Sequence, residues 1–187
     1  MSKTKYLKFR GLSSYAMVYK PDEFNGVKNW KINLHPDEDT IESIKEAGIQ
    51  ARLKDKPVEG VDGKFFTFKR PVEKVFGNRT TFFCPPIIID RDGKEVVKYL
   101  DGGKKVFSNE TGMFEMVGSE ILIGNGSLVE VTLEVYPTKR FGNGTRLQSV
   151  KIIDLIEYVR PDEIDEEVVE DDDIPFEPET PSKKVSW

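Results

Sequence analysis

Short runs in which hydrophobic and polar residues alternate recur along most of the chain. Alternation with a period of two is typical of strands that bury one face. In one run, Trp30, Ile32 and Leu34 share one side, while Lys31 and Asn33 share the other. The runs that predict strands are 6–10, 15–20, 27–34, 64–70, 120–123, 128–136 and 146–159. The chain is therefore predicted to be mostly β.

One helix is predicted between these strands. Asp39 and Glu42 have the spacing of an N-capping pair, and apolar residues follow them at helical spacing. Gly48 is expected to end this helix. Asn-Gly pairs within 124–126 and 142–144 are typical of hairpin turns, so we expect a three-stranded meander over 120–159.

These elements fit a small barrel or sandwich formed by residues 1–159. The five-stranded OB-fold is the small barrel that is noted for binding oligonucleotides, and residues 36–56 would be its helical insertion. From residue 160 to 187 the apolar periodicity disappears and prolines recur, so this segment is predicted to be a disordered acidic tail.

The charges divide at the same boundary. Residues 160–187 hold three basic and 11 acidic residues, whereas the preceding residues hold 25 basic and 22 acidic ones. A negative tail on a mildly basic domain can lie against that domain or be displaced by another polyanion. The pattern therefore favours a tail that competes with nucleic acid.

Single copies of two residue types limit the chemistry. Cys84 is the only cysteine and His35 the only histidine. An intramolecular disulfide and a zinc site of Cys and His ligands are thereby excluded, and no metal or cofactor is expected. We see no apolar run long enough for a signal or membrane segment, so we expect a cytoplasmic protein that does not bind membranes.

The run 64–70 has the sharpest local pattern. As a strand it would place Lys64, Phe66, Phe68 and Arg70 on one face, with two aromatic rings between two cations. Nucleic-acid bases stack on such rings, and cations hold the phosphates. The alternative is that these phenylalanines belong to the core, and the pattern leaves both interpretations open.

Basic and aromatic residues continue to alternate downstream. Phe76, Arg79 and Phe82 follow within a segment that contains one acid, Glu73. A second basic group occupies the loop expected at 137–145, in the position of the loop between strands four and five of an OB-fold. The loop supplies Lys139, Arg140 and Phe141, and Arg146 follows it.

The sequence gives little support to catalysis. Asp90 and Asp92 could hold a metal, as in a nuclease, but an acidic residue before Gly93 is more simply a turn. No nucleophile motif surrounds Cys84. We therefore expect a protein that is not an enzyme, with a metal-dependent nuclease as an alternative.

Three segments resemble bacteriophage single-stranded DNA-binding proteins. They are PPIIID at 85–90, IGNGS at 123–127 and RLQSVKIIDLIEY at 146–158. The resemblance implies one OB-fold, an acidic C-terminal tail and binding of single-stranded DNA without sequence preference. It also implies a role in phage DNA replication, recombination and repair in the cytoplasm of the infected host.

The predicted tail contains the residues that we expect to contact other proteins. DDDIPF at 171–176 resembles the acidic tip of bacterial single-stranded DNA-binding proteins, which recruits replication and repair enzymes. By this resemblance the tail would engage partners such as DNA polymerase and helicase-primase. The residues implied are Asp171, Asp172, Asp173, Ile174, Pro175, Phe176 and the terminal Trp187. A protein-interaction module that presents this acidic peptide is the other class of function, and the sequence leaves open whether the chain forms a homodimer.

Overall fold

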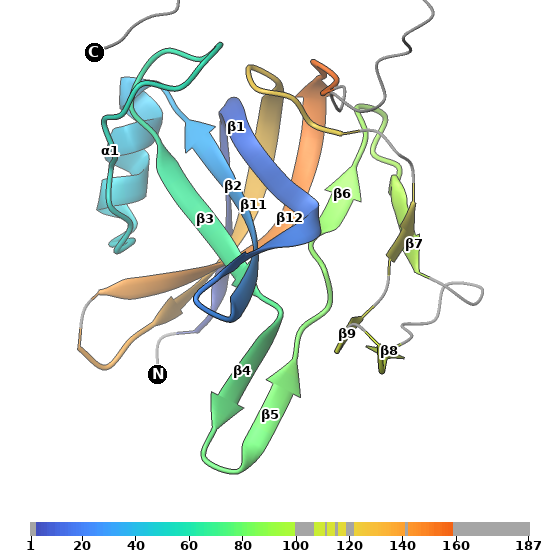
Figure 1. Cartoon of the computed structure of the whole chain (residues 1–187). Helices are drawn as coiled ribbons and strands as arrows, with labels where there is room; N and C mark the ends of the chain where they lie inside the picture. Colours follow the sequence, from blue (N-terminus) through green and yellow to red (C-terminus); the bar gives the residue numbers. More distant parts are fainter. Residues whose placement is uncertain are drawn as a thin grey trace, which may run out of the picture.

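A curled six-stranded sheet dominates the protein (Figure 1). The structure is a computed structural model and describes residues 3–99, 107–110, 112–114, 116–118, 122–140 and 142–158. The order across the sheet is β3-β2-β1-β11-β12-β6. The strands are β1 (Lys5–Phe24), β2 (Val27–His35), β3 (Phe66–Pro71), β6 (Ile87–Ile89), β11 (Leu128–Pro137) and β12 (Asn143–Asp154). The prediction of a mostly β chain is confirmed.

The sheet curls until its first and fifth strands meet. β3 lies beside β12, and the Arg70 guanidinium on β3 donates a 3.3 Å hydrogen bond to the carbonyl of Leu147 on β12. Four antiparallel pairings join the five strands β3, β2, β1, β11 and β12 in that order. These five strands curl into a half-barrel in the order expected of the predicted barrel, and among the described residues no strand pairing closes it between β3 and β12. β6 adds a sixth strand parallel to β12.

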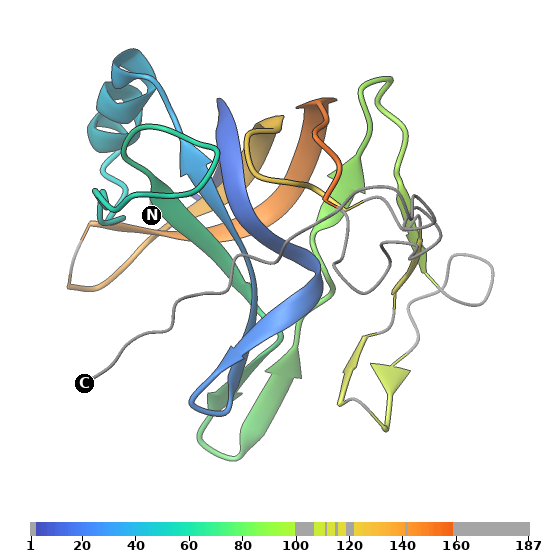
Figure 2. The ribbon, with the colours of Figure 1, turned by 45° about the horizontal axis from the view of Figure 1, so that its top comes forward.

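The other elements surround this barrel (Figure 2). α1 (Glu38–Glu46) lies between β2 and β3 in the chain, as the predicted helical insertion requires. A projecting hairpin formed by β4 (Glu73–Phe76) and β5 (Arg79–Phe82) follows β3. The remaining short strands are β7 (Val97–Tyr99), β8 (Phe107–Ser108), β9 (Met113–Phe114) and β10 (Met116–Gly118).

Alternation along the strands builds the core. In β2, Ile32 and Leu34 are fully buried, and in β11 Val131 and Leu133 are fully buried. Because successive strand side chains point to opposite faces, these residues fill the barrel while their neighbours face outward. Phe68 of β3 belongs to the same cluster.

Two of the predicted strands form a single strand in the structure. The runs 6–10 and 15–20 both lie in β1, whose pairing with β2 shifts register between Ser14 and Met17. Tyr15, inside this irregularity, has a φ of 45°, a left-handed conformation that is uncommon for a residue other than glycine. A β-bulge bends β1 here without ending it.

The predicted helix is confirmed, but its predicted cap is wrong. α1 begins at Glu38, and the side chain of Asp37 accepts a 2.8 Å hydrogen bond from the Thr40 backbone N–H. Asp39 instead lies in the first turn. Gly48, with a φ of 71°, directly follows the C-cap residue, as expected.

The predicted meander is a two-stranded hairpin in the described residues. β11 and β12 pair as expected, whereas Ile123 makes only an isolated bridge with Glu157. Asn143 was expected in a turn, but it is the first residue of β12. Its side-chain amide donates to the carbonyl of Ala47 at 2.8 Å, so a tertiary contact with the end of α1 fixes it.

Several expectations lie outside the described residues. They concern Phe141, residues 120–121 and 159 of the predicted strands, and the whole predicted tail from 160 to 187, including Phe176 and Trp187. Among the residues that are described, no helix has the length and apolar character needed to cross a membrane.

The only histidine is part of a buried polar chain. His35 Nε2 lies 2.8 Å from Ser14 Oγ, and His35 Nδ1 lies 3.1 Å from the Gly63 carbonyl. If Nδ1–H donates to Gly63, Nε2 is left to accept from the serine. Ser14 is fully buried, so this pair ties β1, β2 and the loop before β3 together and offers no substrate access.

We expect His35 to make stability depend on pH. Burial lowers the pKa of His35 below its usual 6.5, so in acid the unfolded chain binds the proton more readily than the folded protein. The melting temperature should fall as pH decreases below about 6.5, toward the lowered folded pKa. In His35→Gln this part of the decrease should be absent. Equal slopes of melting temperature against pH in both proteins between about pH 7 and 5 would contradict this role.

Candidate nucleic-acid interface

The outer side of β2 and β3 carries a group of lysines. Lys31 on β2 lies directly opposite Lys69 on β3, and Lys54 reaches the same side from the loop that follows α1. We call Lys31, Lys54 and Lys69 the cationic face. Like charges directly opposite one another in a sheet are destabilising, so an anion bound between them would relieve the repulsion.

Hydrogen bonds fix Lys54 on this face. Its Nζ donates to Thr67 Oγ1 at 2.9 Å, and Thr67 Oγ1 donates to Asn33 Oδ1 at 2.7 Å. Desolvation first, and then the charge of Lys69 and other nearby cations, lower the pKa of Lys54. The cations that contribute beside Lys69 are Lys56, Lys31 and Arg52. The face is therefore a region of concentrated positive charge.

One carboxylate lies on the edge of the cationic face. Asp22 of β1 forms an ion pair with Lys31, and this contact lowers the pKa of Asp22. Both side chains remain partly exposed, and an exposed ion pair of this kind contributes little to stability because solvent screens it. A phosphate can therefore compete with Asp22 for Lys31 at little cost.

The predicted stacking role of Phe66 and Phe68 is wrong. Each ring is 1% exposed, and the two rings pack against each other within the core with centroids 6.0 Å apart. The prediction chose the wrong face of β3, because the aromatic residues turn inward and their neighbours Thr67 and Lys69 turn outward. A base cannot reach a ring inside the barrel.

Arg70 and Arg146 have protein partners. Arg70 Nε donates to the Cys84 carbonyl, and Arg70 also bonds the Leu147 carbonyl as described above. Arg146 forms a 2.9 Å ion pair with Glu134, and its guanidinium lies 4.6 Å from the Phe83 ring centroid. The predicted phosphate contacts of these two arginines therefore compete with contacts that hold the barrel together.

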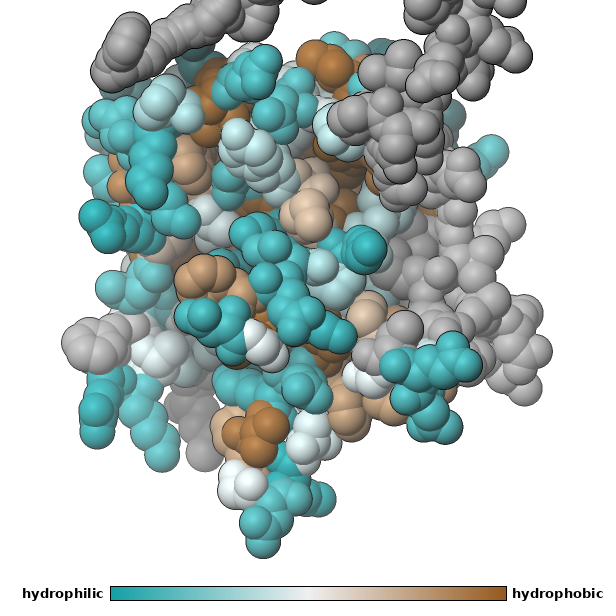
Figure 3. All heavy atoms as spheres, viewed as in Figure 1, coloured by the Kyte–Doolittle hydropathy of each residue, from teal (hydrophilic) through white to brown (hydrophobic). Residues whose placement is uncertain are grey.

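The projecting hairpin presents the other predicted residues to solvent. We call residues 73–82 the arm. Phe76 is 59% exposed and has the Lys74 ammonium 5.1 Å from its ring centroid, while Arg79 directly opposite is also exposed. Phe82 at the base is 37% exposed and packs edge-on against Phe107. Figure 3 shows hydrophobic side chains at the surface along this hairpin, above its hydrophilic tip.

Three further predicted cations are exposed. Lys64 lies just before β3, and Lys139 and Arg140 lie in the loop between β11 and β12. This loop is the one expected between the fourth and fifth barrel strands. Phe141 was predicted beside them and lies outside the described residues.

Asp90 belongs to a turn. Its Oδ1 accepts hydrogen bonds from the backbone N–H groups of Asp92 and Lys94, at 2.9 and 2.8 Å. The carboxylate is thus engaged by its own backbone, as the turn interpretation predicted. Across the described part of the chain, no three His, Cys, Asp or Glu side chains gather as metal ligands.

Sequence reasoning missed the cationic face. Lys31 was visible as the polar side of a half-buried strand, and Lys69 lies inside the run that drew attention to Phe66 and Phe68. Two alternating strands whose polar positions both hold lysine would have been a usable signal. The place of Lys54 depends on how the loop after α1 folds back, which local sequence does not indicate.

Comparisons with known proteins give structural neighbours only. A scan against models of protein families finds no match, and a search of curated protein sequences finds none either. One solved structure that matches is gp2.5, a single-stranded DNA-binding protein encoded by bacteriophage T7, with 16% identity and a TM-score of 0.47. The alignment covers 88% of this chain and 97% of that one. The single-stranded DNA-binding protein of bacteriophage Enc34 matches with 14% identity and a TM-score of 0.44, covering 86% and 87%. Scores this low carry no conclusion about a ligand.

Two substitutions separate core aromatics from surface ones. Phe68→Ala should lower the free energy of unfolding by about 3–5 kcal/mol, because it empties a packed core position. Phe76→Ala on the exposed arm should change it by about 0.5 kcal/mol or less. Urea unfolding followed by circular dichroism measures both. A Phe68→Ala protein as stable as the wild type would contradict the core assignment.

Proposed function

We propose that this protein binds single-stranded DNA without sequence preference, across the outer side of β2 and β3. The observation that carries the proposal is the cationic face, where Lys31, Lys54 and Lys69 converge on an OB-type barrel. The β2–β3 side and the loops that flank it are where OB-folds bind oligonucleotides. The face offers positive charge and no pattern of groups that would select a base sequence.

Phosphate neutralisation supplies most of the affinity in this proposal. Each phosphate held by a lysine releases condensed counterions from the strand, which makes binding sensitive to salt. Lys31 and Lys69 repel each other in the free protein, and a phosphate between them replaces repulsion with attraction. Lys64, Lys139 and Arg140 would extend the path of the backbone.

Exposed aromatic rings of the arm supply the stacking. Phe76 lies on the hairpin that directly continues β3, with Lys74 and Arg79 beside it. A base on an exposed ring is worth about 1–3 kcal/mol, and stacking accepts any base. Phe82 is a weaker candidate because one side of its ring already contacts Phe107.

The proposed cellular role follows from the proposed binding of single-stranded DNA. We propose that the protein coats single strands during phage DNA replication, recombination and repair, in the cytoplasm of an infected cell, and catalyses no reaction. The tail would recruit DNA polymerase and helicase-primase and would compete with DNA for the cationic face. The charge difference between the tail and the preceding residues supports the competition.

Charge removal tests the proposed surface. In the double variant Lys31→Gln, Lys69→Gln, oligo-dT affinity should fall, and the slope of log K against log salt should decrease by about 0.7 for each phosphate that the variant no longer neutralises. Fluorescence anisotropy of a labelled oligonucleotide measures both quantities. A labelled oligonucleotide is used because the intrinsic fluorescence of Trp30, which is fully buried, cannot report direct stacking of a base.

The matched control removes the same charge elsewhere. Lys8 and Lys94 are exposed and lie outside the cationic face, so Lys8→Gln with Lys94→Gln should leave the slope near that of the wild type. Equal slopes in all three proteins would refute binding at the cationic face. An absence of oligo-dT binding by the wild type at low salt would refute the function itself.

Truncation tests the tail. A chain that ends at residue 159 should bind oligo-dT more tightly than the full chain at low salt, because an intramolecular polyanion is removed. The difference should shrink as salt rises, since salt screens the competition. Equal affinity of the two chains at low salt would refute the competitor role.

A further inference from the structure

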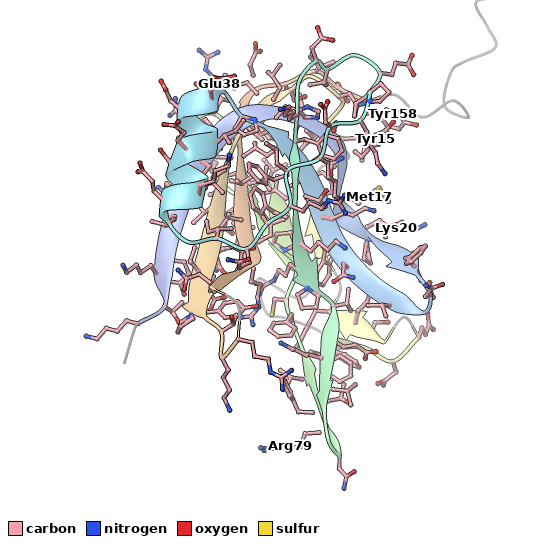
Figure 4. The ribbon with its side chains drawn as sticks, turned by 90° about the vertical axis from the view of Figure 1, so that its left-hand side faces the viewer. Tyr15, Met17, Lys20, Glu38, Arg79 and Tyr158 are labelled. Carbon is pink, nitrogen blue, oxygen red and sulfur yellow. The ribbon has the colours of Figure 1, made fainter. Side chains whose placement is uncertain are left out.

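A cavity lies beside the bulge of β1. Its volume is about 830 Å³, in the range of sites that hold drug-sized ligands. Residues from β1, the turn after Ile123 and the last described segment line it. Those used below are Tyr15, Met17, Tyr19, Lys20, Asn125 and Tyr158. Figure 4 shows Tyr15 and Tyr158 near each other, with Met17 and Lys20 further along β1.

The strained backbone of Tyr15 helps to form the cavity. The bulge between Ser14 and Met17 and the φ of 45° place Tyr15 outside the regular pleat. Asn125 holds this conformation, since its Oδ1 accepts from the Tyr15 N–H at 2.9 Å. The Asn125 amide nitrogen donates in turn to the Glu59 carbonyl at 3.1 Å. Bulges that redirect a side chain are over-represented beside functional sites, and strained residues cluster there.

The lining suits a flat ring with polar edges. Tyr15 and Tyr158 are 55% and 50% exposed, so two aromatic rings are open to a ligand. Tyr19 also lines the cavity, and its hydroxyl is shielded from solvent without a hydrogen-bond partner in the described residues. Burial raises the pKa of Tyr19 to about 12, so the hydroxyl keeps its proton and remains a donor. Lys20 adds a cation at the cavity.

The cavity adjoins the cationic face. Met17, which lines the cavity, pairs directly with Lys31 across β1 and β2. Directly opposite residues of an antiparallel pair project from the same side of a sheet, with Cβ atoms about 5 Å apart. A bound DNA strand with one phosphate held by Lys31 can therefore direct a neighbouring base toward the cavity.

We propose that this cavity takes one unstacked nucleobase of the bound strand. Tyr15 and Tyr158 provide the stacking surfaces, and Lys20 contacts the phosphate that leads into the cavity. This inference rests on the proposed binding of single-stranded DNA and adds to it a base site on β1, separate from the arm. It also gives the strained Tyr15 backbone a function.

Tyrosine replacements test the site. Tyr15→Ala and Tyr158→Ala should each weaken oligo-dT binding about tenfold at fixed low salt, because a stacking partner is removed. The slope of log K against log salt should stay unchanged, since every cation that neutralises a phosphate is still present. Tyr6→Ala is the matched control, because Tyr6 is 62% exposed on the same strand but outside the cavity. It should bind as the wild type does.

The outcomes distinguish this inference from the function on which it rests. If both cavity variants bind with wild-type affinity while Lys31→Gln with Lys69→Gln binds more weakly, the base site is refuted and the proposed function stands. If the wild type does not bind oligo-dT, both fail. Circular dichroism melts check folding, and Tyr158→Ala decides the question if Tyr15→Ala does not fold. A 2-aminopurine base placed within the oligonucleotide should be quenched when the wild type binds, and this quenching should be smaller with Tyr15→Ala and with Tyr158→Ala.

Discussion

The alternation of side chains along β3 is the constraint from which the proposed interface follows. A strand can bury only one of its faces in a barrel, and Phe66 and Phe68 occupy the buried one. Thr67 and Lys69 must then face outward, where pairing with β2 brings Lys69 opposite Lys31. The aromatic core and the cationic face are thus two consequences of one register. A shift of one residue would exchange them and destroy both.

Barrel closure uses cations that could otherwise bind phosphate. Arg70 donates hydrogen bonds to the carbonyls of Cys84 and Leu147. It thereby connects β3 with β12 and with the segment that precedes β6. Arg146 pairs with Glu134 and lies over Phe83. Arg70 thus supports the contact between β3 and β12. On the outer side of β2 and β3, Lys31 pairs with the partly exposed Asp22, a contact that a polyanion can replace.

The sequence predicted the fold better than the site. Alternation identified β2, β11 and most of β12, and the spacing of apolar residues identified α1, because these signals are local. The choice of face in β3 could not be made locally, since both faces hold aromatic residues and only tertiary packing buries Phe65, Phe66 and Phe68 together. The bulge at Tyr15 also escaped prediction, because Asn125, distant in the chain, holds that conformation.

Lysine footprinting tests the central claim most directly. The protein is treated with an amine-acetylating reagent with and without oligo-dT, and modification is measured at each lysine by mass spectrometry. We expect Lys31 and Lys69 to be protected by the oligonucleotide at low salt and to regain reactivity at high salt, while Lys8 and Lys94 react equally in all conditions. Protection of Lys8 or Lys94 with Lys31 and Lys69 unprotected would contradict an interface on β2 and β3.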